Sequence, residues 1–180
     1  MAKKYYAKIT LTNDKEINLC LLEKYAPKSV NQFVTLAKSG FYNGTIFHRV
    51  IEGFMIQTGG YKLEGNAISE LGSVEPIEGE FASNGHKENT INHKLGVISM
   101  ARTNDKNSAT SQFFICSADC SWLDGEYAAF GKTVDEQSDQ VVLEVSKVRT
   151  CVPHPMFSDF PVEPIGIKCV TIEKEEEDND

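Results

Sequence analysis

Hydrophobic and polar residues alternate with a period of two along much of this chain, which is the pattern of β-strands with one buried face. Two such runs, YYAKITLT and INLCLL, lie within the first 22 residues and are separated by Asn13-Asp14-Lys15. Turn-forming residues between two alternating runs predict a β-hairpin.

Between Thr45 and Gly131 the apolar stretches are short and are bounded by glycine, asparagine and aspartate. We interpret five of them as strands: IFHRVI, FMIQT, LGVISMA, SQFFIC and YAAFG. A last alternating run, IGIKCVTIE (165–173), is expected to return beside the N-terminal hairpin and close the sheet.

Two segments have helical spacing instead. The first is predicted at about 27–39, with Pro27 in its first turn and Gly40 after its end. Its apolar residues recur every three or four positions: Val30, Phe33, Val34 and Ala37. The second, at about 136–148, follows the capping-box pattern Thr133-Val-Asp-Glu136. Seven or eight strands with two helices predict a mainly β fold, a barrel whose ends the helices cover.

Length and charge limit the organisation and the partners. A chain of 180 residues suits one domain, which we place at residues 1–172. The last stretch, EKEEEDND (173–180), holds six acidic residues and one lysine, and we expect it to be a solvated, disordered tail rather than a docking site for a basic partner. The net charge of −8 argues against binding to nucleic acid or to an anionic membrane surface.

The cysteines and the N-terminus indicate the compartment. The chain starts without an apolar run of signal-peptide length and nowhere has 18 consecutive apolar residues, so we expect a cytoplasmic protein. Its five cysteines are scattered without pair spacing, as in proteins of a reducing compartment. Cys116 and Cys120 are the only close pair and have no histidine at zinc-finger spacing, which disfavours a metal site.

A charged residue, Arg49, interrupts the apolar run FHRVIEGFMIQTGG (47–60). A strand continuing through Gly53 without a bulge has two faces: Arg49, Met55 and Gln57 on one, and Val50, Phe54 and Ile56 on the other. In SQFFIC, likewise, Gln112 and Phe114 share a face opposite Phe113. Mixed polar and apolar faces suit a groove for a peptide. A second interpretation stays open, in which these are ordinary core positions and Arg49 extends to the rim.

Several longer motifs, in order and in register, carry a family resemblance. They are GFYNGTIFHRV, FHRVIEGFMIQTGG, LGVISMA (95–101), SATSQFFIC (108–116) and WLDGEYAAFGK (122–132). From about residue 5 to 172 the chain resembles the cyclophilin family of peptidyl-prolyl cis-trans isomerases, in particular its short bacterial-type members. The resemblance implies a closed eight-stranded antiparallel barrel capped by two α-helices.

The resemblance also implies a site. Arg49 matches the catalytic arginine of the family, with Phe54 and Gln57 beside it. The residues matching the substrate groove are Met55, Ala101, Arg102, Gln112, Phe114, Trp122, Leu123 and Tyr127. Tyr127 stands where many eukaryotic members have histidine, which puts the contacts near the proline in question.

The activity implied is isomerisation of X-Pro peptide bonds in proline-containing peptides and in unfolded or partly folded proteins, assisting their folding without a cofactor or metal. A tryptophan at position 122 is associated in the family with cyclosporin binding. We expect a monomer, since a closed barrel leaves no obvious strand edge to pair. Two rivals remain: a binding module of the same fold without turnover, and a hydrolase using a cysteine or His48, which we interpret as a buried, hydrogen-bonded residue.

Overall fold

The N-terminal hairpin forms as its alternation predicts. The computed structural model describes residues 1–180, and in it β1 (Lys3–Leu11) pairs with β2 (Glu16–Leu22) so that Ile9 lies opposite Ile17. Both isoleucines are fully buried. Asp14 in the turn has a φ of 67°, a left-handed conformation that aspartate tolerates.

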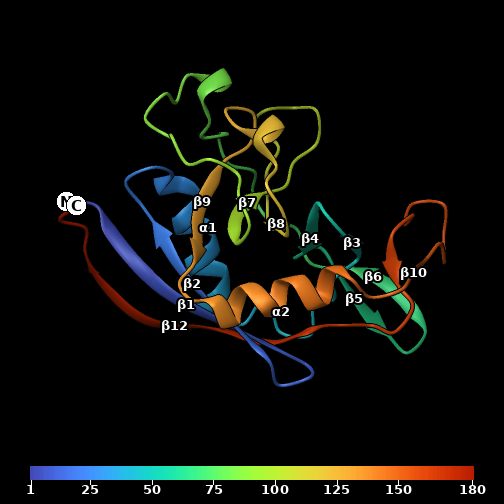
Figure 1. The fold of residues 1–180 in the computed structure, drawn as a ribbon. Coiled ribbons are helices and arrows are strands. Elements are labelled where there is room, and N and C mark those ends of the chain that lie inside the picture. The colour runs from blue at the N-terminus through green and yellow to red at the C-terminus, as the bar shows by residue number, and fades with distance from the viewer.

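Eight strands form one antiparallel sheet in the order β12-β1-β2-β9-β7-β8-β4-β3 (Figure 1). Its other strands are β3 (Arg49–Ile51), β4 (Met55–Thr58), β7 (Val97–Met100), β8 (Phe113–Cys116), β9 (Ala129–Thr133) and β12 (Ile167–Glu177). The segment before β3 bonds to the start of β12, because the amide of Phe47 donates to the carbonyl of Ile165 (2.9 Å) and that of Ile167 to Thr45 (2.7 Å). These bonds connect the two ends of the strand order. The mainly β, eight-stranded fold with two helices is therefore confirmed.

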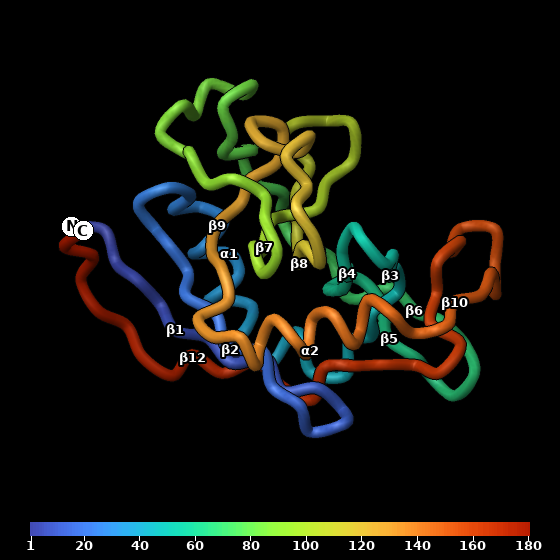
Figure 2. The backbone as a smooth tube through the Cα atoms, in the orientation of Figure 1, coloured from blue at the N-terminus to red at the C-terminus, as the bar shows by residue number.

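The two helices pack on different parts of the sheet. α1 (Pro27–Lys38) contacts β12, β2 and β9, while α2 (Glu136–Ser146) contacts β2, β3, β4 and β9. Figure 2 shows α2 passing from the side of β2 to the side of β3. The buried face of α1 is the predicted one, and its Phe33 lies against the rings of Tyr42, Phe113 and Phe130 at 5.3–5.6 Å. No helix of the chain is long and apolar enough to cross a membrane.

The start of α2 differs from the prediction. The N-cap is Asp135, whose carboxylate accepts a hydrogen bond from the amide of Ser138 at 2.8 Å. Hydrogen bonding to the side chain and the backbone amide of Ser138 lowers the pKa of Asp135. Thr133 cannot cap the helix because it still belongs to β9, and its hydroxyl bonds to Asp139 instead. The capping box at Thr133 is therefore wrong by two residues.

The acidic end of the chain is ordered through Glu177, contrary to the expected disorder from residue 173. β12 continues along β1 until Glu177 lies opposite Lys3. Lysines of β1 face the acids, with Lys3 at 3.1 Å from Glu175 and Lys8 at 3.1 Å from Glu173. Backbone pairing with a basic strand thus outweighs the repulsion among the carboxylates. Figure 2 shows the two termini side by side, where the amide of Asp178 donates to Ala2.

Smaller elements surround the sheet. A hairpin of β5 (Tyr61–Glu64) and β6 (Ala67–Glu70) follows β4, and a second short pair joins β10 (Thr150–Cys151) to β11 (Phe160–Pro161). Figure 1 shows β5, β6 and β10 close together at one side of the molecule. Two 3-10 helices, η1 (Ala82–Asn84) and η2 (Ser121–Leu123), lie in the long connections.

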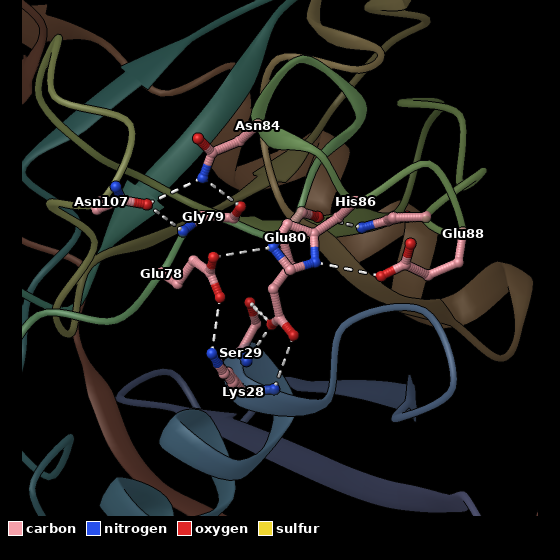
Figure 3. A network of polar contacts seen from close by, with 10 residues as sticks. Lys28, Ser29, Glu78, Gly79, Glu80, Asn84, His86, Glu88 and Asn107 are labelled. Atoms are coloured by element: carbon pink, nitrogen blue, oxygen red, sulfur yellow. Dashed lines mark hydrogen bonds and ion pairs between the residues drawn. The ribbon is translucent and has the colours of Figure 1, made fainter.

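A buried carboxylate, Glu80, holds the start of α1 (Figure 3). The N-cap Ala26 has no side chain that could bond to the helix. Glu80 supplies this cap from a distant loop, because it accepts bonds from the amides of Lys28 (3.0 Å) and Ser29 (2.7 Å) and from the Ser29 hydroxyl (2.8 Å). A negative charge also suits the positive end of the helix. This cap therefore connects the loop of residues 78–93 to α1.

Replacing Glu80 by alanine leaves two helix amides without partners in a buried place, so we expect the free energy of unfolding to fall by about 2–4 kcal/mol. Urea denaturation measures this fall in the free energy of unfolding. Glu78→Ala is the control, since Glu78 makes only exposed ion pairs to Lys28 and His86 and should cost under about 1 kcal/mol. Equal losses in the two variants would contradict the capping role.

Candidate active site

The motif around Arg49 folds back on itself as a tight hairpin. β3 and β4 pair with Arg49 opposite Gln57 and Ile51 opposite Met55. Gly53 in the turn has a φ of 75°, which glycine adopts without steric cost. Arg49, Met55 and Gln57 share a face, as predicted, although the strand does not run on through Gly53.

Phe54 corrects the prediction. An uninterrupted strand would place it on the face opposite Arg49, but the turn brings it to the same side. The guanidinium carbon of Arg49 lies 5.7 Å from the centre of the Phe54 ring. The turn therefore adds an aromatic wall beside the charge.

β8 supplies the floor of the site. It pairs with β4 so that Phe114 lies opposite Gln57, while Phe113 points into the core and is fully buried. Phe114 is 5% exposed and lies edge-on to Tyr127 at 5.8 Å. The alternation predicted for this strand is confirmed.

These strands and two loops enclose a cavity of about 140 Å³. Its lining is Arg49, Phe54, Met55, Gln57, Ala101, Arg102, Phe114, Leu123 and Tyr127. Every one of them was predicted as a site residue. A larger cavity of about 560 Å³ lies near the first hairpin turn and the end of α2, but none of these residues lines it.

The other two predicted residues lie beside the cavity. Oε1 of Gln112 accepts a hydrogen bond from Nε2 of Gln57 at 2.9 Å, and Oε1 of Gln57 accepts one from Nη1 of Arg49 at 3.4 Å. Trp122 is 62% exposed and lies 5.7 Å from Phe54, ring centre to ring centre. Gln112 therefore helps to orient Arg49, and Trp122 widens the apolar wall.

Arg49 carries its charge at the solvent edge of this apolar cavity. Its side chain forms no ion pair, and the long bond to Gln57 is its one hydrogen bond. A guanidinium remains charged at any pH of interest and presents several donors in a fixed plane. The site therefore offers a positive charge that no carboxylate neutralises.

Arg102 is held quite differently. Its guanidinium lies between the rings of Phe81 and Tyr127, at 4.9 and 4.5 Å, and donates to the carbonyl of Glu126 at 2.6 Å. Aromatic stacking and a strong bond fix this side chain as a wall of the cavity. The backbone next to Arg102 is also fixed, since the amide of Ala101 donates to the carbonyl of Gln112 at 3.0 Å.

Sequence reasoning missed a buried support under the floor. His93 lies almost parallel to Phe114 at 6.1 Å, and its ring nitrogens bond to Asp124 (3.0 Å) and Ser99 (2.9 Å). Burial lowers the pKa of His93, while Asp124 partly offsets this effect. Ser99 is only six residues from His93, but Asp124 is 31 residues away, and no local pattern identifies this group.

Neither a histidine base nor a thiol nucleophile faces the cavity. His48 is buried against Tyr61 and does not line the cavity, and burial together with Arg49 lowers its pKa to about 4. The expected burial of His48 is confirmed, although its Nδ1 has no hydrogen-bond partner. Burial raises the pKa of the Cys116 and Cys120 thiols, which makes thiolate formation unfavourable.

Comparison with known proteins shows which proteins this chain is similar to. Residues 6–172 match the family described as cyclophilin type peptidyl-prolyl cis-trans isomerase/CLD. The chain is 43% identical to peptidyl-prolyl cis-trans isomerase A of Dickeya dadantii, over 91% of this chain and 82% of that protein. It is 38% identical to isomerase B of Escherichia coli, over 89% and 96%. A solved Cryptosporidium parvum cyclophilin, in a structure with the dipeptide Ala-Pro, superposes with a TM-score of 0.72 at 26% identity, over 94% of this chain and 99% of that one.

The low pKa of His48 predicts a loss of stability in acid. Above pH 6.5 the ring is neutral in both states and contributes nothing to the pH dependence. As the pH falls from 6.5 to about 4, the unfolded chain takes up a proton that the folded one refuses, so the free energy of unfolding drops by up to roughly 3 kcal/mol.

Urea denaturation of wild type and His48→Gln across this pH range measures the effect. We expect His48→Gln to lose most of the pH dependence of the free energy of unfolding that His48 causes. The pH dependence that His93 causes should remain. His154→Gln, at an exposed histidine, serves as the control and should keep the wild-type slope. A His48→Gln profile parallel to wild type would contradict the assignment.

Proposed function

The chain belongs to the cyclophilin-type peptidyl-prolyl cis-trans isomerases, and we propose that it accelerates rotation about X-Pro bonds by placing the charge of Arg49 against the proline nitrogen. The observation that carries the proposal is an arginine with no ionic partner at the edge of a small apolar cavity. It acts without a cofactor, and its substrates are proline-containing peptides.

The reaction needs no bond to be broken. Rotation about a peptide C–N bond faces a barrier of about 18–20 kcal/mol because resonance is lost when the amide twists. At X-Pro bonds both isomers are populated, and their uncatalysed exchange takes roughly 10–100 s. In the twisted state the proline nitrogen becomes pyramidal and regains a localised lone pair. A catalyst must therefore stabilise that lone pair more than it stabilises either planar form.

Arg49 is suited to this task. A guanidinium donor directed at the nitrogen interacts weakly with a planar amide, whose lone pair is delocalised, and strongly with the twisted one. Gln57, bonded to both Arg49 and Gln112, keeps the guanidinium over the cavity. A pyrrolidine ring bound against Phe54, Phe114 and Leu123 would exclude water from the cavity side of this interaction.

The remaining walls hold the substrate. Phe54, Met55, Phe114 and Leu123 form an apolar container for the pyrrolidine ring. We assign the backbone of Ala101 and Arg102 to pairing with the residue before proline, as in β-strand addition. With the ring and the preceding residue both held, rotation is confined to the bond between them.

We extend the proposal to partners and compartment. The open cavity grips one ring and a short length of backbone, which supports unfolded or partly folded proteins as substrates. Exposed Trp122 next to Phe54 supports cyclosporin as a competitor for the same groove, and displacement of a bound peptide measures it. The five free cysteines support a cytoplasmic protein, and the joined ends of the sheet support a monomer.

The test is exchange of a short Ala-Pro peptide, followed by magnetisation-transfer NMR. We expect Arg49→Ala to lose about 10²–10³ in kcat/KM and Arg49→Lys to lose less, because lysine keeps the charge without the planar donors. Arg149→Ala, at an exposed arginine away from the cavity, is the control and should match wild type. Peptide binding by the wild type without faster exchange would overturn the proposal in favour of a binding module.

A further inference from the structure

A second hollow lies beyond the groove, between the β5–β6 hairpin and the 150–160 segment. Its volume is about 380 Å³. Tyr61 and Ile68 form one wall, and Pro153, Met156 and Phe157 form the other. We call it the distal cavity. Met156 is 67% exposed at its mouth, and nearby Val152 is 64% exposed, an unusual concentration of solvent-facing apolar side chains.

A polar hollow lies between the distal cavity and the groove around Arg49. Tyr61 and Glu70, which line the distal cavity, also line this hollow of about 270 Å³, which reaches Gln112. Gln112 is bonded to Gln57 in the wall of the first cavity. A polypeptide leaving the proline site past Gln112 therefore reaches the polar hollow first and the distal cavity beyond it.

The wall between the two cavities is rigid. The ring of Tyr61 lies edge-on to Phe157 at 5.0 Å and to buried His48 at 4.8 Å. His48 directly precedes Arg49 in the chain. Because these contacts fix Tyr61 relative to β3, the separation between the two cavities is constant.

One carboxylate lies at the boundary of the distal cavity. Glu70 is the only carboxylate lining the distal cavity, and it lies opposite Tyr61 in the β5–β6 register. It is exposed and forms no ion pair. In a protein of net charge −8, this position favours a cationic side chain beside the apolar one that fills the cavity.

We propose that the distal cavity is a second binding site for the substrate polypeptide, which takes an apolar side chain there and places an adjacent lysine or arginine against Glu70. The proposal rests on the isomerase function proposed above. If the residue before proline pairs with Ala101 and Arg102, the chain passes Gln112 in its N-terminal direction, so the recognised residues precede the proline.

The chain itself gives the spacing. Gln57 and Tyr61 are four residues apart, a span of at most about 13 Å at roughly 3.3 Å per residue. A substrate that extends about four or five residues before its proline is therefore long enough to reach the distal cavity. A short Ala-Pro peptide has no such extension.

Three peptides test this inference in the exchange measurement: a short Ala-Pro peptide, one with Lys-Leu four and five residues before the proline, and one with the same extension after it. We expect the N-terminal extension to lower KM about tenfold and the C-terminal one to leave it unchanged. Glu70→Lys should remove roughly three- to fivefold of this gain, and a peptide with glutamate in place of lysine should restore it. Met156→Glu should weaken binding of the leucine.

The controls separate this inference from the isomerase function itself. Glu144→Lys makes the same change of charge on α2, away from both cavities, and should preserve the gain. All variants should isomerise the short peptide at the wild-type rate. Equal KM values for the three peptides, with full activity on the short one, would overturn the distal site alone, whereas loss of activity on the short peptide in wild type would overturn the proposed function.

Discussion

The register of three strands is the constraint on which the site depends. Val50, Ile56 and Ile115 point into the core from β3, β4 and β8, and each is at most 1% exposed. Because side chains alternate along a strand, a shift of one residue would turn these core residues to solvent and the site residues into the core. Burial of one face therefore fixes the other, and Arg49, Gln57 and Phe114 converge without needing contacts of their own to hold the register.

The two arginines of the groove show how the same side chain is used in two ways. Arg102 is stacked between two rings and bonded to the backbone, so it acts as a wall. Arg49 has one long bond to an uncharged amide and an apolar surface below it. A carboxylate in place of Gln57 would hold Arg49 more tightly but would consume the charge that the twisted amide needs. Weak tethering is thus what the proposed role of Arg49 requires.

The spacing of apolar residues predicted the elements that local interactions determine. Alternation located the first hairpin, and the three-and-four spacing located α1 and its buried face. The grouping of site residues came from motifs in register rather than from periodicity, which placed Phe54 on the wrong face because it does not reveal the turn at Gly53. Partners distant in sequence were not predictable at all: Glu80 caps a helix some 50 residues away, and β1 orders the acidic end of β12.

The most direct test of this account is to neutralise Arg49 without removing it. Gln57→Glu has the same size and places a carboxylate where the 3.4 Å bond now lies. With a saturating Ala-Pro peptide, we expect exchange by the folded variant at neutral pH to slow at least about tenfold while peptide affinity stays near wild type. The rate should recover in acid, below the usual pKa of a glutamate, as the new carboxyl is protonated. An unchanged rate at neutral pH would mean that the free charge of Arg49 does not drive the reaction.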